Sequence, residues 1–381
     1  MSDIAVPLAD VRLTEEDIAA IADTYRSGWL SLGPRTQEFE AAFAGFVGAE
    51  HALATSSCTA ALHLMCLAAG LGPGDEVVVP AMTFVATVNC VTYTGARPVF
   101  ADIEALDEPW TSARTIEEAI TPRTKAIMYM AYGGHPARSA EVRELARDRG
   151  LMLLEDAAHA IGTRVGGEHL GTLGLAGAFS FFSNKNLAIG EGGMLVTDDE
   201  ELATRVRALR SHGMTSLSWD RHKGHAFGYD VVALGFNYRV DEPRAALGLR
   251  RLARLEDENA QRRVIDAAYR ERLAELPELV LPVPAAPEDR HAHHVFTLAL
   301  PAGTDRDSLR RGLSERGVQT SVHYPPAHGF SIYADGAPEL PVTDEYAVRA
   351  LTLPMFSHMT ERQVDLVVDG LRAGLPAGTR R

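Results

Sequence analysis

The first chemically suggestive feature of the chain is an isolated lysine. Lys185 lies in residues 179–186 (FSFFSNKN), at the end of an apolar run and just before the glycine-rich residues 190–193 (GEGG). A lysine at the end of a buried strand cannot easily extend its amine into water, so burial should lower its pKa and favour a nucleophilic amine. Spacing alone leaves open a surface lysine in a loop.

A carboxylate follows a second apolar run. Asp156 lies in residues 155–159 (EDAAH), directly after LMLL. Ligand-binding groups collect at the carboxyl ends of the strands of parallel α/β sheets. A carboxylate there can pair with a protonated ring nitrogen and keep it cationic, as a pyridoxal cofactor needs in order to act as an electron sink. The alternative is an aspartate that caps the next helix.

A hydroxyl-rich turn opens a helical pattern at residues 56–62 (SSCTAAL). Hydroxyls and free backbone N–H groups at a helix N-terminus form an anion site, although they also serve as a simple N-cap. The phosphate interpretation depends on the lysine and the carboxylate elsewhere in the chain.

The elements that must position these residues alternate between strands and helices, which favours an α/β fold with a mostly parallel sheet covered by helices. Expected strands are residues 76–80, 98–102, 125–130, 151–155, 176–182 and 194–197, and expected helices are near 58–70, 84–94 and 138–149.

The last third of the chain has a different pattern. A charged helical stretch at residues 241–276 is followed by a smaller α+β unit, with a linker-like segment at 282–287. We therefore expect a large domain over 1–250, including an N-terminal helical segment, and a small C-terminal domain over 251–381. In the small domain we expect strands at 294–300 and 318–324 and helices at 305–316 and 360–371.

Composition excludes several classes of protein. The chain has 381 residues and a formal net charge of −14, which argues against nucleic-acid binding but not against a small anionic substrate. Its three cysteines, Cys58, Cys66 and Cys90, form no disulfide framework and fit a reducing cytoplasm. Asp3, Asp10 and Arg12 come without an apolar run between them, so we do not expect the N-terminus to be a signal peptide. The sequence shows no apolar run of roughly 18 residues, so no membrane span is expected.

These motifs together resemble one family, the DegT/DnrJ/EryC1/StrS sugar-nucleotide aminotransferases, whose fold is the type I fold of pyridoxal 5'-phosphate (PLP) enzymes. The resemblance covers almost the whole chain. It rests on residues 27–34 (SGWLSLGP), 80–87 (PAMTFVAT), 95–100 (GARPVF), 155–160, 179–186, 190–193, 211–213 (SHG), 235–239 (GFNYR), 322–325 (VHYP) and 353–356 (LPMF).

The resemblance implies roles around the cofactor ring. Lys185 is the residue that would hold PLP as a Schiff base, and Asp156 would pair with the pyridine nitrogen. His159 stands where the family has Gln or His, near the ring and its phenolic oxygen. Phe84 falls at the aromatic position that stacks on the ring.

The resemblance also implies a phosphate site and a shared active site. Cys58, Thr59 and Ser180 occupy phosphate-binding positions, although Cys58 stands where Gly is common. Asn237 matches an Asn that reaches the phosphate of a neighbouring subunit, which implies a homodimer with active sites at the interface.

Substrate contacts are implied for Trp29, Leu30, His323 and Tyr324. A basic, aromatic stretch at residues 219–225 (WDRHKGH) could hold a nucleotide sugar or be a solvated loop. In residues 130–133 (MAYG) the His that often precedes the Tyr is missing, which affects sugar-side contacts. His291, His293 and His294 lack the carboxylate or Cys partners of a metal site, so no metal is expected.

The activity implied is transfer of an amino group from L-glutamate to a keto-sugar nucleotide, at C4 of a dTDP-4-keto-6-deoxyhexose, in amino-sugar biosynthesis for an antibiotic or polysaccharide. Lys185 stands where dehydrating relatives carry His, which favours transamination. The alternatives are a C3 keto-sugar or keto-cyclitol aminotransferase, and a regulatory or scaffold protein that retains the fold. Cysteine desulfuration is disfavoured because all cysteines precede residue 91.

Overall fold

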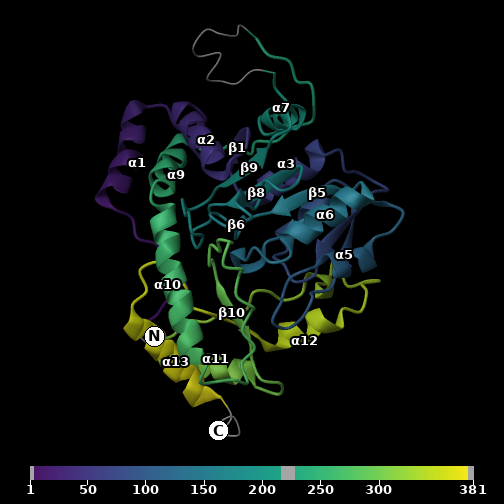
Figure 1. Ribbon diagram of the computed structural model, residues 1–381. Coiled ribbons are helices and arrows are strands. Elements are labelled where there is room, and N and C mark those ends of the chain that lie inside the picture. Colours follow the sequence, from purple (N-terminus) through teal and green to yellow (C-terminus); the bar gives the residue numbers. More distant parts are fainter. Residues whose placement is uncertain (1–3, 216–227, 376–381) are drawn as a thin grey trace.

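The computed structural model describes residues 4–215 and 228–375. Its centre is a seven-stranded sheet with the order β1-β9-β8-β5-β4-β2-β3 (Figure 1). The strands are β1 (His51–Thr55), β2 (Glu76–Pro80), β3 (Arg97–Ala101), β4 (Thr124–Met130), β5 (Met152–Asp156), β8 (Ala176–Ser180) and β9 (Gly193–Thr197). The five neighbouring strands β8, β5, β4, β2 and β3 are parallel to one another, whereas β9 runs antiparallel to β8 and β1. The predicted α/β fold class is confirmed.

Helices cover both faces of this sheet, which explains why its strands are apolar along most of their length. One face packs against α2 (Pro34–Val47), α5 (Ala113–Ala119), α6 (Ser139–Arg149) and α9 (Glu242–Leu252). The other packs against α3 (Cys58–Ala68), α4 (Ala86–Thr92) and α7 (Glu200–Leu209). Helix α1 (Glu15–Ser27) lies against α9.

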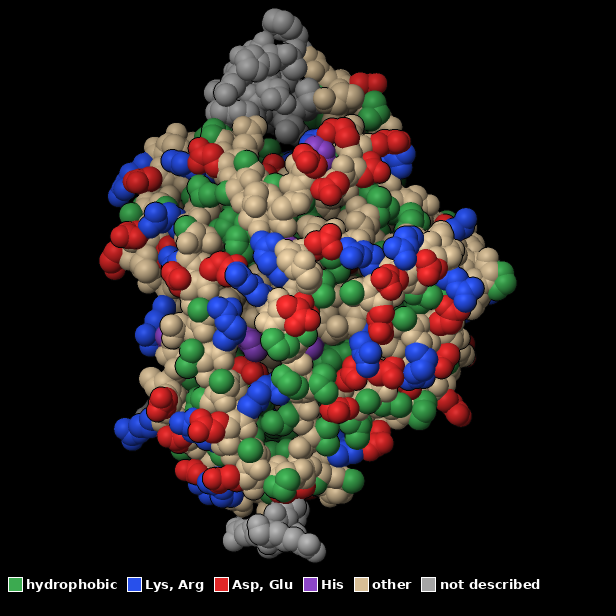
Figure 2. Space-filling model, in the orientation of Figure 1, with side chains coloured by type: hydrophobic (Ala, Val, Ile, Leu, Met, Phe, Trp, Pro, Cys, Tyr) green, Lys and Arg blue, Asp and Glu red, His purple; other side chains and the backbone are tan. Residues whose placement is uncertain are grey.

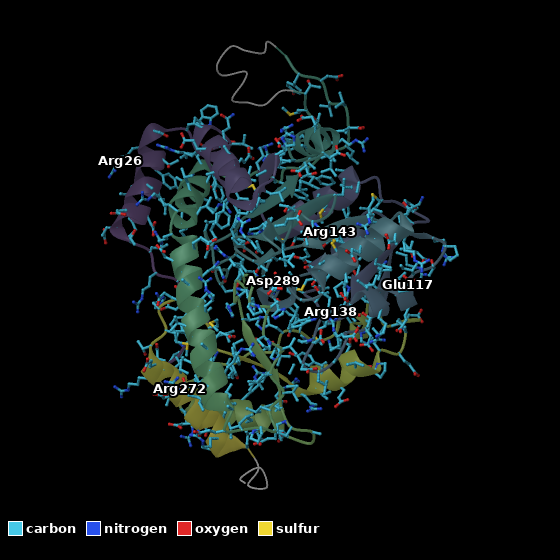
Figure 3. The ribbon with its side chains drawn as sticks, viewed as in Figure 1. Arg26, Glu117, Arg138, Arg143, Arg272 and Asp289 are labelled. Atoms are coloured by element: carbon cyan, nitrogen blue, oxygen red, sulfur yellow. The ribbon has the colours of Figure 1, made fainter. Side chains whose placement is uncertain are left out.

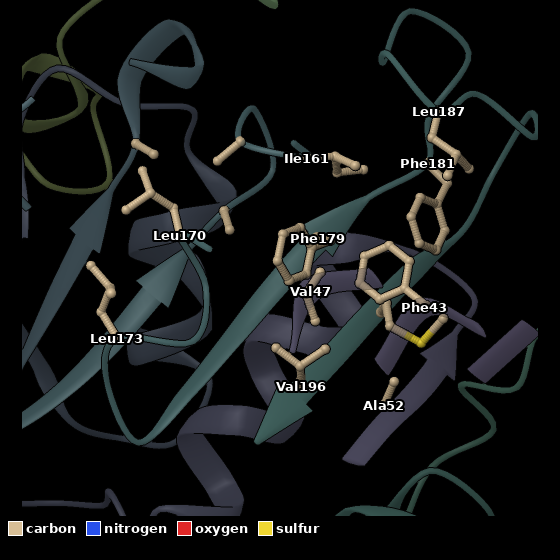
Figure 4. Close-up of a cluster of buried hydrophobic side chains, with 14 of the residues drawn as sticks. Phe43, Val47, Ala52, Ile161, Leu170, Leu173, Phe179, Phe181, Leu187 and Val196 are labelled. Carbon is tan, nitrogen blue, oxygen red and sulfur yellow. The ribbon is translucent and has the colours of Figure 1, made fainter. Parts of the chain in front are cut away.

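Aromatic rings fill the first of these interfaces (Figure 4). Phe43 of α2 meets Phe179 edge to face with a centroid distance of 5.1 Å, and Phe181 at 5.5 Å. Both partners precede Lys185 in the chain, so this packing anchors the segment that carries the lysine.

The carboxyl ends of the parallel strands gather the polar motifs at one edge of the sheet. β5 ends at Asp156 and β8 ends at Ser180. Gly193 begins β9 and pairs in register with both Ser180 and Thr55. A Cβ atom at Gly193 would lie 2.5 Å from the carbonyl carbon of Ser57, so only glycine allows the N-terminus of α3 to approach β9 this closely.

The remaining elements lie below the sheet in Figure 1. They are α10 (Leu255–Leu273), β10 (Phe296–Ala299), α11 (Arg306–Glu315), α12 (Pro341–Arg349), β11 (Ala350–Leu353) and α13 (Glu361–Gly374). All of them except α12 contribute to a third apolar cluster, whereas the buried apolar residues of α12 belong to a smaller cluster with Trp110 and Tyr132. The short strands β6 (Arg164–Val165) and β7 (Glu168–His169) form a separate ribbon. The division at residue 250 stays a prediction.

The expected helical stretch over 241–276 consists of two helices, α9 and α10, because the chain turns at Arg254, whose φ of −115° and ψ of 4° are not helical. The strand expected over 318–324 was wrong. Residues 318–324 form no strand. They make only isolated bridges, because the pairing partner changes from Val6, opposite Val318, to Thr352 of β11, opposite Ser321, before a continuous ladder can form.

Charged side chains of both signs are mixed over the face seen in Figure 2. Many form ion pairs around the periphery, where Figure 3 labels Arg143 and Arg272. Arg143 lies 2.6 Å from Glu168, and Arg272 lies 2.6 Å from Asp365. Among the described helices, none combines the length and apolar character needed to cross a membrane.

Candidate active site

Lys185 lies in the turn between β8 and β9. Its N–H donates to the carbonyl of Phe182, and Ile189 donates back to Phe181, both at 2.9 Å, so the turn is closed on itself. The residue keeps partial exposure, yet burial around the amine lowers its pKa to about 8, opposed by nearby Cys58 and Asp156. An amine with this pKa is present in both protonation states near neutrality, as acid–base chemistry requires.

Asp156 is buried at the end of β5. Its Oδ2 accepts a hydrogen bond of 2.6 Å from the hydroxyl of Thr87, and its Oδ1 accepts one of 3.1 Å from the N–H of Ala158. Burial raises the pKa of this carboxyl, while these two donors and Lys185 oppose the shift. A cationic partner would offset the cost of burying the carboxylate.

His159 links the end of β5 to Tyr324. Its Nδ1 accepts from the N–H of Gly133 at 3.3 Å, so a neutral ring carries its hydrogen on Nε2 and donates to the Tyr324 hydroxyl at 3.0 Å. Burial, with nearby Lys185, holds the pKa of His159 well below its usual range. Because Tyr324 accepts from His159, its own O–H is left to donate towards another group.

Phe84 and His323 both lie beside the ring of Tyr324. Phe84 is 53% exposed, and its ring centroid lies 5.8 Å from that of Tyr324, so one ring face is available for stacking. The Nδ1 of His323 lies 2.9 Å from the hydroxyl of Thr352. Burial and nearby Lys185 lower the pKa of His323 to about 4, which keeps it neutral.

The predicted phosphate positions lie at the start of α3 and the end of β8. Ser57 caps α3 by accepting from the N–H of Ala60 at 3.1 Å. Burial raises the pKa of the Cys58 thiol well above its usual range, which leaves the backbone N–H as its anion-binding group. Ser180 is buried where β8 meets Gly193. An open hollow of about 450 Å³ lies beside this turn, lined by Ser56, Ser57, Thr59, Ala60, His63, Tyr93 and Tyr238.

Asn237 is exposed and directly precedes Tyr238, which lines this hollow. The carbonyl of Tyr238 accepts a hydrogen bond from the N–H of Ser56 at 2.8 Å. The substrate role of Trp29 and Leu30 stays a prediction. Trp29 lines a groove of about 610 Å³, and the carbonyl of Leu30 accepts from Glu242. Within residues 4–215 and 228–375, the structure gives no contact that joins Leu30 to Lys185. Residues 219–225 lie outside the described part.

The structure adds contacts of three residues, His294, Asn186 and Thr87, that the sequence did not predict. The resemblance implied that a His in the region of residues 291–294 faces the active site, without saying which, and the structure places Nε2 of His294 3.3 Å from Nζ of Lys185. Asn186, which follows Lys185 directly, contacts His294, and Thr87 contacts Asp156. The adjacency of Asn186 to Lys185, and the spacing of Thr83 and Thr87 by one helical turn, were the available signals.

The side chains of His291 and His293 pack against other aromatic rings. His291 and His293 stack with a centroid distance of 3.9 Å, and His291 meets His135 at 4.9 Å. Over the described ranges, no group of His, Cys, Asp or Glu has the geometry of a metal site.

The site combines an amine of lowered pKa, a buried carboxylate without a guanidinium partner among the described residues, and a capped helix N-terminus, which are groups that a PLP-dependent aminotransferase needs. The chain belongs to the DegT/DnrJ/EryC1/StrS aminotransferase family, whose model matches residues 11–372. It is a sugar aminotransferase, which excludes the regulatory or scaffold alternative.

Individual relatives match over nearly their full length. The spore coat polysaccharide biosynthesis protein SpsC of Bacillus subtilis (strain 168) is 41% identical over an alignment of 369 residues, and the match covers 94% of each chain. The structure of DesV from S. venezuelae is 38% identical with a TM-score of 0.89 and covers 99% of both chains. DesI, solved in the presence of its TDP-sugar product, is 34% identical with a TM-score of 0.88, covering 99% of this chain and 94% of its own.

PLP is the cofactor of this family, and solved relatives include PLP and PMP forms of one sugar aminotransferase. The residues present here fit the group. Among residues 4–215 and 228–375 the direct partners of the Asp156 carboxylate are neutral donors, so a protonated ring nitrogen could pair with it. Phe84 offers a ring face, and Gly193 keeps the N-terminus of α3 close to Ser180. Lys185 offers the amine.

Proposed function

We propose that this aminotransferase moves the amino group of L-glutamate to C4 of a dTDP-4-keto-6-deoxyhexose. The observation that carries the chemistry is Lys185, whose amine has a pKa of about 8 beside buried Asp156. Support for a nucleotide sugar comes from DesI, which was solved with its TDP-sugar product, and support for amino-sugar biosynthesis comes from SpsC.

In this proposal each residue has a defined task. When bound, PLP supplies the electron sink that stabilises charge on the carbon beside the transferred nitrogen. Nζ of Lys185 would move the proton between that carbon and C4′ of the cofactor. Its pKa allows it both to accept and to donate a proton near neutrality. The carboxylate of Asp156 holds the proton on the ring nitrogen. Tyr324 is oriented by its hydrogen bond with His159. Its hydroxyl would donate to the phenolic oxygen of the cofactor or to the substrate.

We further propose a homodimer with shared sites. The segment that carries Asn237 exposes apolar side chains, with Val231 55%, Val232 63% and Leu234 91% exposed. Exposed apolar side chains this close together are typical of an interaction surface. A second copy of the chain would cover them and bring Asn237 to its neighbour's phosphate site.

The test of the substrate uses the pyridoxamine form of the enzyme. Candidate keto sugars are added one at a time, and the return of the PLP absorbance is followed. We expect the dTDP-4-keto-6-deoxyhexose to restore it fastest. Faster return with a 3-keto sugar or a keto-cyclitol would replace the proposed substrate, and no return with any keto sugar would contradict the proposal as a whole.

A further inference from the structure

Asn186, the residue after Lys185, has a fixed amide orientation. Its Nδ2 donates 2.8 Å hydrogen bonds to Oδ1 of Asn259 and to the carbonyl of Ala292. Asn259 is itself fixed, because its Nδ2 donates to the carbonyl of Ile161 at 3.0 Å. Since both partners of Asn186 Nδ2 are carbonyl oxygens, its Oδ1 is the atom that faces His294.

This orientation decides the tautomer of His294. Oδ1 of Asn186 lies 3.1 Å from Nδ1 of His294 and can only accept, so Nδ1 must carry a hydrogen. Burial, with nearby Lys185 and His159, holds the pKa of His294 well below its usual range, so the ring is neutral. A neutral ring with hydrogen on Nδ1 has its lone pair on Nε2. That atom lies 3.3 Å from Nζ of Lys185.

We propose that His294 is a positioning residue that accepts a hydrogen bond from the amine of Lys185 through Nε2, in a tautomer imposed by Asn186. The inference rests on the proposed role of Lys185 as the residue that carries the cofactor. With one N–H donated to His294, the lone pair of the neutral amine points away from His294. The amine that leaves the cofactor thus has a defined resting place and orientation for proton transfer.

The backbone of His294 is held independently of its side chain. Its N–H donates to the carbonyl of Gly133 at 3.0 Å, and its carbonyl accepts from Arg262 at 3.4 Å. Replacing the imidazole therefore leaves these contacts in place. This separation makes the contact with Lys185 testable by substitution.

Other titratable groups also face the amine, and their effects must be held constant. They are Asp156, Cys58, His159 and His323. A neutral acceptor stabilises the ammonium form of Lys185 by a hydrogen bond, so its loss should lower the pKa of the amine further.

The experiment measures this pKa in cofactor-free protein. An amine-reactive reagent is pulsed at a series of pH values, and peptide mapping follows labelling of Lys185. We expect half-maximal labelling near pH 8 in the unsubstituted protein, and about one pH unit lower in His294→Leu. His294→Asn should behave like His294→Leu, because its amide replaces Nδ1 but is too short to reach Nζ. His294→Gln, whose amide oxygen reaches the position of Nε2, should restore the original midpoint.

His135→Leu is the matched control, because it removes a buried imidazole that contacts Val283 and Ala137 instead of Lys185. Its labelling midpoint should not move. Thermal unfolding identifies any variant that fails to fold, and the Asn and Gln variants keep the test decisive if the Leu variant does. Equal midpoints in unsubstituted, Asn and Gln proteins would overturn the proposal. Because neither cofactor nor substrate is present, this result is independent of the proposed reaction.

Discussion

Thr87, in the first turn of α4, donates a 2.6 Å hydrogen bond to the buried carboxylate of Asp156 at the end of β5. The hydroxyl of Thr87 also lies 2.6 Å from that of Thr83. Since the single hydrogen of Thr87 goes to Asp156, Thr83 must donate to Thr87. The relay fixes the carboxylate and, as the largest opposing effect, limits the rise in the pKa of Asp156 that burial causes.

The first prediction concerns this relay. Thr87→Val keeps the shape of the side chain but removes the donor, so Asp156 should be less well oriented and harder to ionise. We expect PLP affinity or turnover to fall about tenfold, equivalent to roughly 1.4 kcal/mol. Thr87→Ser is the control and should retain most of both quantities. Equal PLP dissociation constants and turnover in the Val and Ser variants would contradict the role of the hydroxyl.

The second prediction is the site of covalent attachment. The chain has three lysines, Lys125, Lys185 and Lys223, so a borohydride-reduced adduct can be assigned unambiguously by peptide mapping. We expect the label on the peptide that contains Lys185. Lys185→Ala should lose both the label and turnover, whereas Lys125→Arg should keep both. A label on another lysine would overturn the assignment.

The third prediction is a pH dependence. Below a pKa of about 8 the amine of Lys185 is an ammonium ion and cannot attack a carbonyl. The rate of PLP capture by the cofactor-free protein should therefore rise as the pH increases through about 8 and then level off. Stopped-flow absorbance measures this rate. A rate that keeps rising to the ordinary lysine pKa of about 10.4 would show that burial does not lower the pKa of this amine.

The same lowered pKa affects folding with a defined sign. The folded protein releases the Lys185 proton at a lower pH than the unfolded chain, so burial of the ammonium destabilises the cofactor-free protein at and below about pH 8. As the pH rises from about 8 towards the unfolded value, this penalty should be relieved.

The sequence predicted the parts of the site that depend on local pattern. Asp156 and Lys185 follow apolar strands, and such strands end at the same edge of a parallel sheet. β1 was missed because His51–Thr55 is short and lacks aliphatic β-branched residues, and β11 because it follows α12 without a break. The contact of His294 with Lys185 spans 109 positions, so only tertiary packing brings the two together.

The fourth prediction concerns the charge of Asp156. Asp156→Asn keeps the shape of the side chain but removes the negative charge that would hold the ring nitrogen protonated. Transamination should fall by several orders of magnitude, while PLP still binds through its phosphate contacts and Lys185. Turnover and the PLP dissociation constant are measured on the same sample. Near-normal turnover in the Asn variant would rule out the electron-sink role of this carboxylate.

The fifth prediction is that the active site is shared between two subunits. The exposed side chain of Asn237 follows the exposed residues Val231, Val232 and Leu234, which a second copy of the chain would cover. A two-fold interface would repeat the contact, giving two equivalent sites. Asn237→Asp should place a negative charge beside the phosphate and weaken PLP binding in its own homodimer. Since only a dimer would offer the full phosphate site, PLP should also stabilise the dimer.

Subunit mixing tests the shared site directly. In a mixed dimer of Lys185→Ala and Asn237→Asp subunits, one site carries both defects and the other carries neither. Activity should therefore return on mixing. Each mixed dimer has one intact site, so its activity should approach half that of an unsubstituted dimer. Size-exclusion chromatography and subunit exchange are checked first, and a mixture of Lys185→Ala with Asp156→Asn subunits is the control. Both of these defects lie in one subunit's half of the site, so each mixed-dimer site keeps one of them and activity should stay low. If the variants are dimers that exchange and the first mixture also stays inactive, Asn237 acts within its own subunit.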